Sequence, residues 1–194
     1  MSIHLEGPSL LLNSYDFADA FGGCGMLMDK TWNCPKNTTA KHVANWIGVA
    51  AKDAGGSLAN VVLNFHGEPG RVLVGEATPG KMMRSGTYIN ETFHVIDNDN
   101  AGVLFPLRQF KIGTLWFHSC DLAGGTIGKK FCRQLAITAG CAVVAAEKEQ
   151  EEWWNFVNAI FMPKGSIDDF EGPVYIWDKK GEMQKFDPNG GSWK

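Results

Sequence analysis

Two residues able to do covalent chemistry follow two apolar stretches of the chain. His66 comes directly after residues 58–65, and Cys120 comes shortly after residues 112–117. A thiol beside an imidazole can act as a nucleophile, because the imidazole takes up and returns the protons. The backbone N–H groups of Gly67, which has no side chain to block approach, and of Cys120 could hold the oxyanion that such a reaction forms. The sequence therefore predicts a cysteine–histidine pair, if the fold brings the two positions together.

The surrounding pattern predicts that they meet at one edge of a parallel sheet. Both apolar stretches, and a third over residues 141–146, have the length and composition of buried strands. Apolar residues at helical spacing predict helices over residues 38–54 and 125–139, each ended by glycine. Strands that alternate with helices are almost always parallel. Because ligands bind where the carboxyl ends of parallel strands meet, His66 and Cys120 are expected to share that edge.

The remaining chain predicts shorter elements. The expected elements before the core's second strand are a short strand over 71–75, loops with at most short strands over 76–103, and a helical turn over 105–110. After the core we expect a helix over 147–161 with acidic residues at its N-terminus, and a β-hairpin made by 174–177 and 182–186. We therefore expect a single domain over residues 1–194. It is of the α/β class with three α/β/α layers, a mainly parallel sheet, and a C-terminal helix and hairpin within 150–190.

Composition argues against several classes of function. The chain has 194 residues, a formal net charge of −3 and no cluster of Lys and Arg, so no nucleic-acid partner is expected. None of its apolar runs approaches the roughly 20 residues that a membrane span needs, so no membrane partner is expected either. No signal-peptide pattern is visible at residues 1–12, which favours the cytoplasm.

The cysteines predict neither a disulfide framework nor a metal site. They number five, an odd set without regular spacing, at positions 24, 34, 120, 132 and 141. Reduced thiols in a cytoplasm fit such a set. Cys24 and Cys34 lack the tight spacing of structural zinc ligands, and the glycine-rich segments lack the Lys-Ser/Thr of a phosphate loop. We expect no metal and no organic cofactor.

The two strand ends resemble those of the clan CD cysteine peptidases, which include caspases, legumains, clostripain, gingipains and separases. The shared pattern is an apolar strand ending in His-Gly and a second ending in a small residue and Cys. A bacterial caspase-like domain family of unknown function is more similar still. It has His-Gly-x-Pro-Gly, here residues 66–70, before a strand, helix and alanine-rich strand, here 116–146. The resemblance covers about residues 40–150 and implies a caspase-like fold.

The resemblance also implies roles for individual residues. His66 and Cys120 correspond to the catalytic pair, and the backbone amides of Gly67 and Cys120 to the oxyanion donors. His118 stands at the position that lines the pocket for the substrate side chain, where caspases have glutamine and legumains glutamate, so the preferred side chain stays open. Glu147 and Glu149, in the loop after the third strand, are candidate contacts for a basic substrate residue.

These observations predict a cysteine endopeptidase acting on a peptide or protein substrate. Two alternatives stay open: a caspase-like scaffold that binds a partner protein without catalysis, and a cysteine acyltransferase that keeps the pair but transfers the acyl group. A lone cysteine at a strand end is usually a small core residue, so the prediction depends on its pairing with His66. His118, close to Cys120 in the chain, could perturb the thiol but is not assigned as the base.

Overall fold

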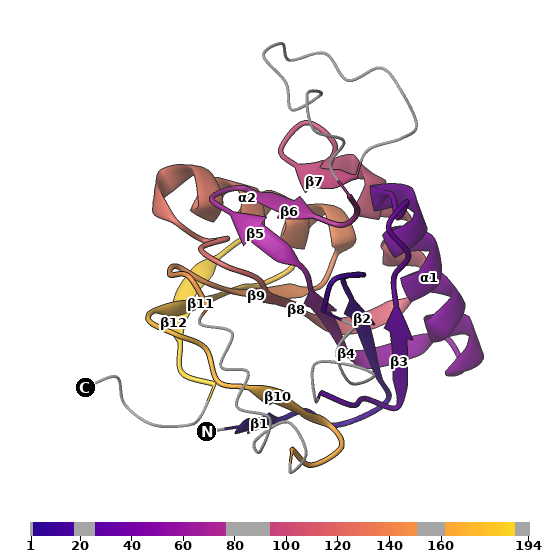
Figure 1. The fold of residues 1–194 in the computed structure, drawn as a ribbon. Helices are drawn as coiled ribbons and strands as arrows, with labels where there is room; N and C mark the ends of the chain where they lie inside the picture. The colour runs from indigo at the N-terminus through magenta and orange to yellow at the C-terminus, as the bar shows by residue number, and fades with distance from the viewer. Residues whose placement is uncertain (1, 18–25, 77–93, 151–161, 189–194) are drawn as a thin grey trace.

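A seven-stranded sheet forms the centre of the domain in a computed structural model that describes residues 2–17, 26–76, 94–150 and 162–188 (Figure 1). Its order is β12-β11-β9-β8-β4-β2-β3. The parallel strands are β3 (Lys30–Asn33), β2 (Ser9–Asn13), β4 (Ser57–Asn64), β8 (Lys111–His118) and β9 (Ala142–Ala146). β11 (Val174–Trp177) pairs antiparallel with β9, and β12 (Met183–Phe186) completes a hairpin with it. The predicted α/β class, mainly parallel sheet and C-terminal hairpin are thus confirmed.

Helices cover one face of this sheet. Alternate strand residues, such as Leu63 of β4 and Phe117 of β8, pack in one cluster with the apolar sides of three helices. These are α1 (Ala40–Asp53), α2 (Gly125–Ala139) and the 3-10 helix η1 (Ala101–Gln109). A capping box begins α1, because Oγ1 of Thr39 accepts from the His42 N–H and Nδ1 of His42 accepts from the Thr39 N–H.

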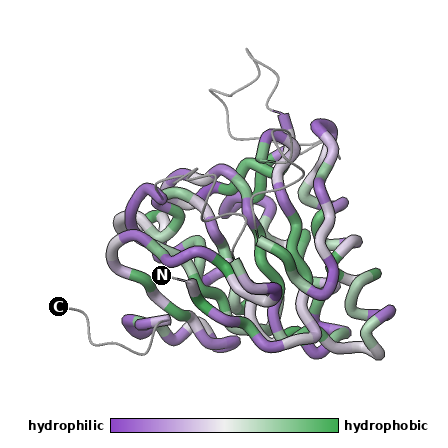
Figure 2. Tube along the Cα trace, turned by 60° about the horizontal axis from the view of Figure 1, so that its bottom comes forward, coloured by the Kyte–Doolittle hydropathy of each residue, from purple (hydrophilic) through white to green (hydrophobic). Residues whose placement is uncertain are grey.

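The other face of the sheet packs against a second apolar cluster. Val62 and Trp116 of the sheet meet Met28, Phe170 and neighbouring residues there. β1 (Ser2–His4) and β10 (Ser166–Asp168) contribute to this layer as an antiparallel pair. Figure 2 shows the hydrophobic segments gathered in the sheet and hydrophilic ones at the turns. A sheet between two covering layers is consistent with the predicted three-layer α/β/α domain.

A small antiparallel sheet rises from the carboxyl edge of the large one. It consists of β5 (His66–Glu68), β6 (Arg71–Leu73) and β7 (Val95–Asp97). A turn at Pro69-Gly70 joins β5 to β6. His66 therefore begins a new strand, whereas the sequence predicted only that the preceding strand stops there. Within the predicted loop region, 94–103 holds β7 and the start of η1, and 77–93 lies outside the described residues.

The helix predicted over 147–161 does not begin where expected. Residues 147–150 are not helical, and 151–161 lie outside the described residues. The physical reason is that the backbone here has other partners. The Glu147 N–H donates to Pro173 O at 2.9 Å, and Lys148 O accepts from the Asp121 N–H at 2.8 Å. These bonds hold the segment in the loop beyond β9.

No helix within the described ranges is long and apolar enough to cross a membrane.

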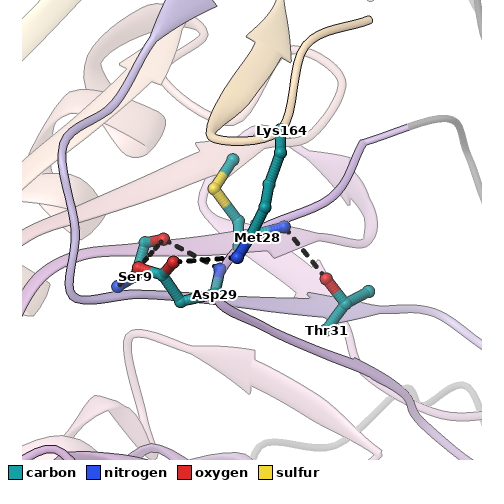
Figure 3. Close-up of polar contacts among 5 residues, drawn as sticks. All are labelled: Ser9, Met28, Asp29, Thr31 and Lys164. Carbon is teal, nitrogen blue, oxygen red and sulfur yellow. Dashed lines mark hydrogen bonds and ion pairs between the residues drawn. The ribbon is translucent and has the colours of Figure 1, made fainter.

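A polar cluster around Asp29 fastens the starts of β2 and β3 together (Figure 3). Oδ2 of Asp29 accepts from the Ser9 N–H at 3.0 Å and from the Ser9 hydroxyl at 3.1 Å. Its Oδ1 pairs with Nζ of Lys164 at 3.2 Å, in the segment that leads to β10. The hydrogen bonds with Lys164 and Ser9 hold the pKa of the Asp29 carboxyl below its usual value. One side chain thus links the parallel sheet to the β1-β10 layer.

Replacing Asp29 by Asn is expected to lower the free energy of unfolding by about 1 kcal/mol at neutral pH. Because the carboxyl has a lower pKa in the folded chain, its stabilising effect is present above the unfolded pKa of about 3.9. The effect is lost as the pH falls through the folded pKa. Urea unfolding between about pH 7 and 3 should therefore show a smaller acid-dependent loss in Asp29→Asn than in the parent.

The matched control is Asp53→Asn, which removes an exposed ion pair to Lys30 of 2.7 Å. That variant should cost less than about 0.5 kcal/mol, because exposed ion pairs contribute little. Equal losses from the two variants would contradict the role given to Asp29.

Candidate active site

The register of β4 and β8 brings the predicted pair to one place. The strands are parallel neighbours, and Asn64 near the end of one lies opposite His118 at the end of the other. The chain therefore leaves both strands at the same level, with His66 two residues beyond Asn64 and Cys120 two residues beyond His118. The expectation that the two strands end at the same edge of a parallel sheet is confirmed, and the condition that they be neighbours is met.

Gly67 is the point of closest approach between the two segments. A Cβ atom at position 67 would lie 2.8 Å from Cβ of Ser119 and 2.9 Å from the carbonyl oxygen of Cys120. Further along, the Gly70 N–H donates to Leu122 O at 3.2 Å. The backbone of β5 thus runs directly against residues 119–122. Only a residue without a side chain fits this contact, which places the Gly67 and Cys120 backbones side by side.

His66 is held by a residue that the sequence analysis did not single out. Its Nε2 lies 2.8 Å from Oδ2 of Asp16, and its ring packs 4.6 Å from that of Phe17, centroid to centroid. Because a carboxylate can only accept, Nε2 carries the proton in the neutral ring. Nδ1 is then the nitrogen with a lone pair, able to receive a proton.

Asp16 was missed because β2 was not predicted. The apolar triplet Leu10-Leu11-Leu12 is too short to predict a strand by itself. It forms the buried middle of β2, which lies beside β4. An acidic residue just beyond the carboxyl end of a third parallel strand is the signal that could have identified it.

Cys120 differs from the other described cysteines in being only partly buried. Burial raises the pKa of the Cys34 and Cys141 thiols to about 12 and also raises that of Cys132, so these thiols are poor nucleophiles. Cys132 and Cys141 are core residues. Cys24 lies outside the described residues.

The Cys120 thiol faces the loop that follows β9. Its Sγ lies 3.6 Å from the carbonyl oxygen of Gln150 and can donate to it. The Gln150 side chain fixes this carbonyl in place, since it donates to Lys148 O at 2.8 Å and accepts from the Glu171 N–H at 2.9 Å. The thiol therefore has a weak partner on a well-anchored loop.

A row of polar side chains crosses the sheet at the level of His118. Nδ2 of Asn13 donates to Oδ1 of Asn33 at 3.2 Å, and Nδ2 of Asn64 donates to Oδ1 of Asn13 at 3.1 Å. Oδ1 of Asn64 then lies 3.3 Å from Nδ1 of His118. The four residues occupy matching positions on β3, β2, β4 and β8. Three neighbouring hydrogen bonds thus satisfy much of the polar surface buried by this row.

His118 ends the row with one nitrogen unused. Its Nε2 is buried and has no hydrogen-bond partner among the described residues, and the ring packs 5.5 Å from that of Phe170. Burial lowers the pKa of His118, although the charge of Asp168 opposes this effect. The ring is consequently neutral near pH 7.

The two glutamates predicted to contact substrate have different surroundings. Glu147 pairs with Nζ of Lys129 at 2.7 Å and accepts from the Tyr175 hydroxyl at 2.6 Å, and these partners lower its pKa. Glu149 is exposed. Burial, followed by the charges of Glu149 and Glu147, raises the pKa of Asp121, the neighbour of Cys120. Both glutamates are thus close enough to this end of the sheet to act on it, but the Glu147 carboxylate already has two partners.

Within the described part of the chain, no group of three or more His, Cys, Asp or Glu side chains is placed to hold a metal ion. Comparison of the chain with models of known families, with curated proteins and with solved structures found no significant match. The site has to be interpreted from its own geometry.

Gly67→Ala is expected to separate β5 from residues 119–120, because the added methyl group cannot fit at 2.8 Å from Ser119. We expect a loss of about 1–3 kcal/mol in the free energy of unfolding. The rate at which a small alkylating reagent modifies Cys120 should also change. Denaturant unfolding and peptide mapping by mass spectrometry measure the two effects.

Gly102→Ala is the control, since a Cβ atom there would meet no atom within 4 Å. It should change stability by no more than about 0.5 kcal/mol. If Gly67→Ala were as stable as Gly102→Ala, the close packing of β5 on the Cys120 segment would be wrong.

Proposed function

We propose that the protein is a cysteine endopeptidase in which Cys120 is the nucleophile and His66 transfers the protons. One observation supports the proposal most: the strand that begins with His66 packs through Gly67 directly on Cβ of Ser119 and on the backbone of Cys120. Two further observations support it. His66 has a carboxylate partner at 2.8 Å, and Cys120 is the one described cysteine that burial does not shield.

The reaction requires both nitrogens of His66 to have defined roles. The thiol proton passes to Nδ1, and Sγ of Cys120 forms a bond to the carbonyl carbon of the substrate. The N–H groups of Gly67 and Cys120 would stabilise the oxyanion. The C–N bond then breaks, and the amine leaves with the proton from Nδ1. Water, giving its proton to His66, adds to the thioester; the C–S bond breaks, and the thiol regains a proton.

Asp16 acts in this proposal as a positioning residue. Its contact with Nε2–H keeps the neutral ring in the tautomer whose lone pair is on Nδ1. Both side chains are partly exposed, at 42% for His66 and 35% for Asp16, so this pair adds little to stability. Its effect is expected mainly on the geometry of proton transfer.

Two other functions are compatible with the same domain. A cysteine acyltransferase would form the same thioester but pass the acyl group to an amine instead of water. A scaffold would bind a partner protein through the same domain without covalent chemistry. The partial exposure of Cys120, unlike the burial of the other described thiols, favours the two covalent alternatives over the scaffold.

Cys120→Ala is expected to abolish both peptide hydrolysis and labelling by a peptide electrophile such as an acyloxymethyl ketone. His66→Ala should lower kcat/KM at least about 100-fold, the usual contribution of a general acid–base group. Cys141→Ala, which changes a buried thiol, is the control and should keep the label. Hydrolysis or labelling that persists in Cys120→Ala would contradict the peptidase. Labelled protein that cleaves peptides only when an amine acceptor is present would identify the acyltransferase instead.

Asp16→Ala is expected to lower kcat on the order of 10- to 100-fold, because the His66 ring loses its orientation. Asp16→Asn should retain more activity, since its amide oxygen can still accept from Nε2–H. The nitrogen-15 NMR signals of His66 provide a second measurement, in which the proton should be less confined to Nε2 in Asp16→Ala. Unchanged kcat together with an unchanged tautomer would show that Asp16 has no positioning role.

A further inference from the structure

The unused nitrogen of His118 has a definite hydrogen-bonding character. In the row across the sheet, Asn13 donates through Nδ2 to Asn33 and Asn64 donates through Nδ2 to Asn13, so Asn64 presents Oδ1 to His118. An amide oxygen can only accept. Nδ1 of His118 must therefore carry the proton, which leaves a lone pair on Nε2 of the neutral ring. The direction of these three hydrogen bonds thus makes Nε2 of His118 a buried acceptor.

A buried acceptor without a partner is costly, and native proteins rarely contain one without a reason. This one belongs to the residue that ends β8, two positions before Cys120. The ring is packed against Phe170 and joined to Asn64, so it has little freedom to turn away and hide the nitrogen. A group bound next to Cys120 could supply the missing donor.

The charges described around this end of the sheet are mainly acidic. Asp168 acts on His118 itself, and Asp121 is within range of Glu147 and Glu149. The nearby Lys129 cation is already paired with Glu147. The Ser119 hydroxyl, beside Cys120, is also buried without a hydrogen-bond partner among the described residues and could donate. A substrate carboxylate would nevertheless bring another negative charge to these acidic groups and would leave Nε2 of His118 without a donor. An amide, ammonium or guanidinium group would give Nε2 of His118 its N–H donor and would add no negative charge.

We infer that the substrate side chain recognised beside Cys120 carries an N–H donor, which Nε2 of His118 accepts. The substrate class is thus peptides with glutamine, asparagine, lysine or arginine before the cleaved bond, and not aspartate or glutamate. The inference rests on the proposed function, because it concerns the substrate of the same site. The residue type at position 118 does not by itself indicate the preferred substrate side chain, whereas the free lone pair on Nε2 does.

Three peptides of equal length test the donor directly, with Gln, Glu or Met before the cleaved bond. The three side chains have similar size, but only Gln offers an N–H group. We expect kcat/KM for Gln to exceed that for both others at least about 10-fold, because the analogues leave the buried acceptor unpaired. The same order is expected for the rate at which matching electrophiles label Cys120. Equal rates, or a preference for Glu or Met, would overturn the inference.

His118→Phe tests the assigned residue, since it keeps a ring but removes the acceptor. The ratio of the Gln rate to the Met rate should fall to about one in this variant and stay unchanged in His4→Phe, a change of an exposed histidine on β1. A ratio measured within one sample does not depend on how much of the protein is folded. An unchanged ratio in His118→Phe would overturn the inference while leaving the peptidase intact. Absence of both cleavage and labelling with all three side chains would overturn both proposals.

Discussion

The parallel pairing of β4 with β8 is the constraint on which the site depends. With Asn64 opposite His118, both strands end at the same level, and the chain beyond each is directed over the same edge. β5 then has to pass the turn after β8 at a distance that a side chain at position 67 would not allow. A shift of one strand by one residue against the other would turn the polar residue at its end to the opposite face of the sheet and separate the pair.

The same register produces the polar row beneath the site. Buried amides are expensive unless each finds a partner, and here the buried amides of Asn13 and Asn64 bond to each other and to the neighbouring members of the row. The row therefore stabilises the carboxyl edge only when all its members are present. It also determines the orientation of each amide, and through them the tautomer of His118, although the first member, Asn33, lies two strands away from β4.

Local patterns were enough to predict most of the elements near the site. The lengths of α1 and α2, the two strands that end at residues 64 and 118, and the final hairpin all follow from periodicity and glycine positions. β2 was missed because three leucines carry little pattern by themselves, and its burial comes from β3 and β4 on either side. The contact of Asp16 with His66 spans 50 residues and depends on that strand order, so no local signal contains it. The predicted helix start at Glu147 was wrong because backbone bonds of Glu147 to Pro173 and of Lys148 to Asp121, which also join residues far apart in the sequence, hold that segment.

Burial gives the two histidines of this edge different roles. In the proposed mechanism His66 is the general base, and its side chain is 42% exposed and lies beside the Asp16 carboxylate. His118 is closer to Cys120 in the chain, but burial lowers its pKa and opposes the charged form. It can accept a hydrogen bond without accepting the proton itself. Each ring has one nitrogen held by a neighbour and one lone pair left over, and the different surroundings of that lone pair are why we propose proton transfer for His66 and substrate recognition for His118.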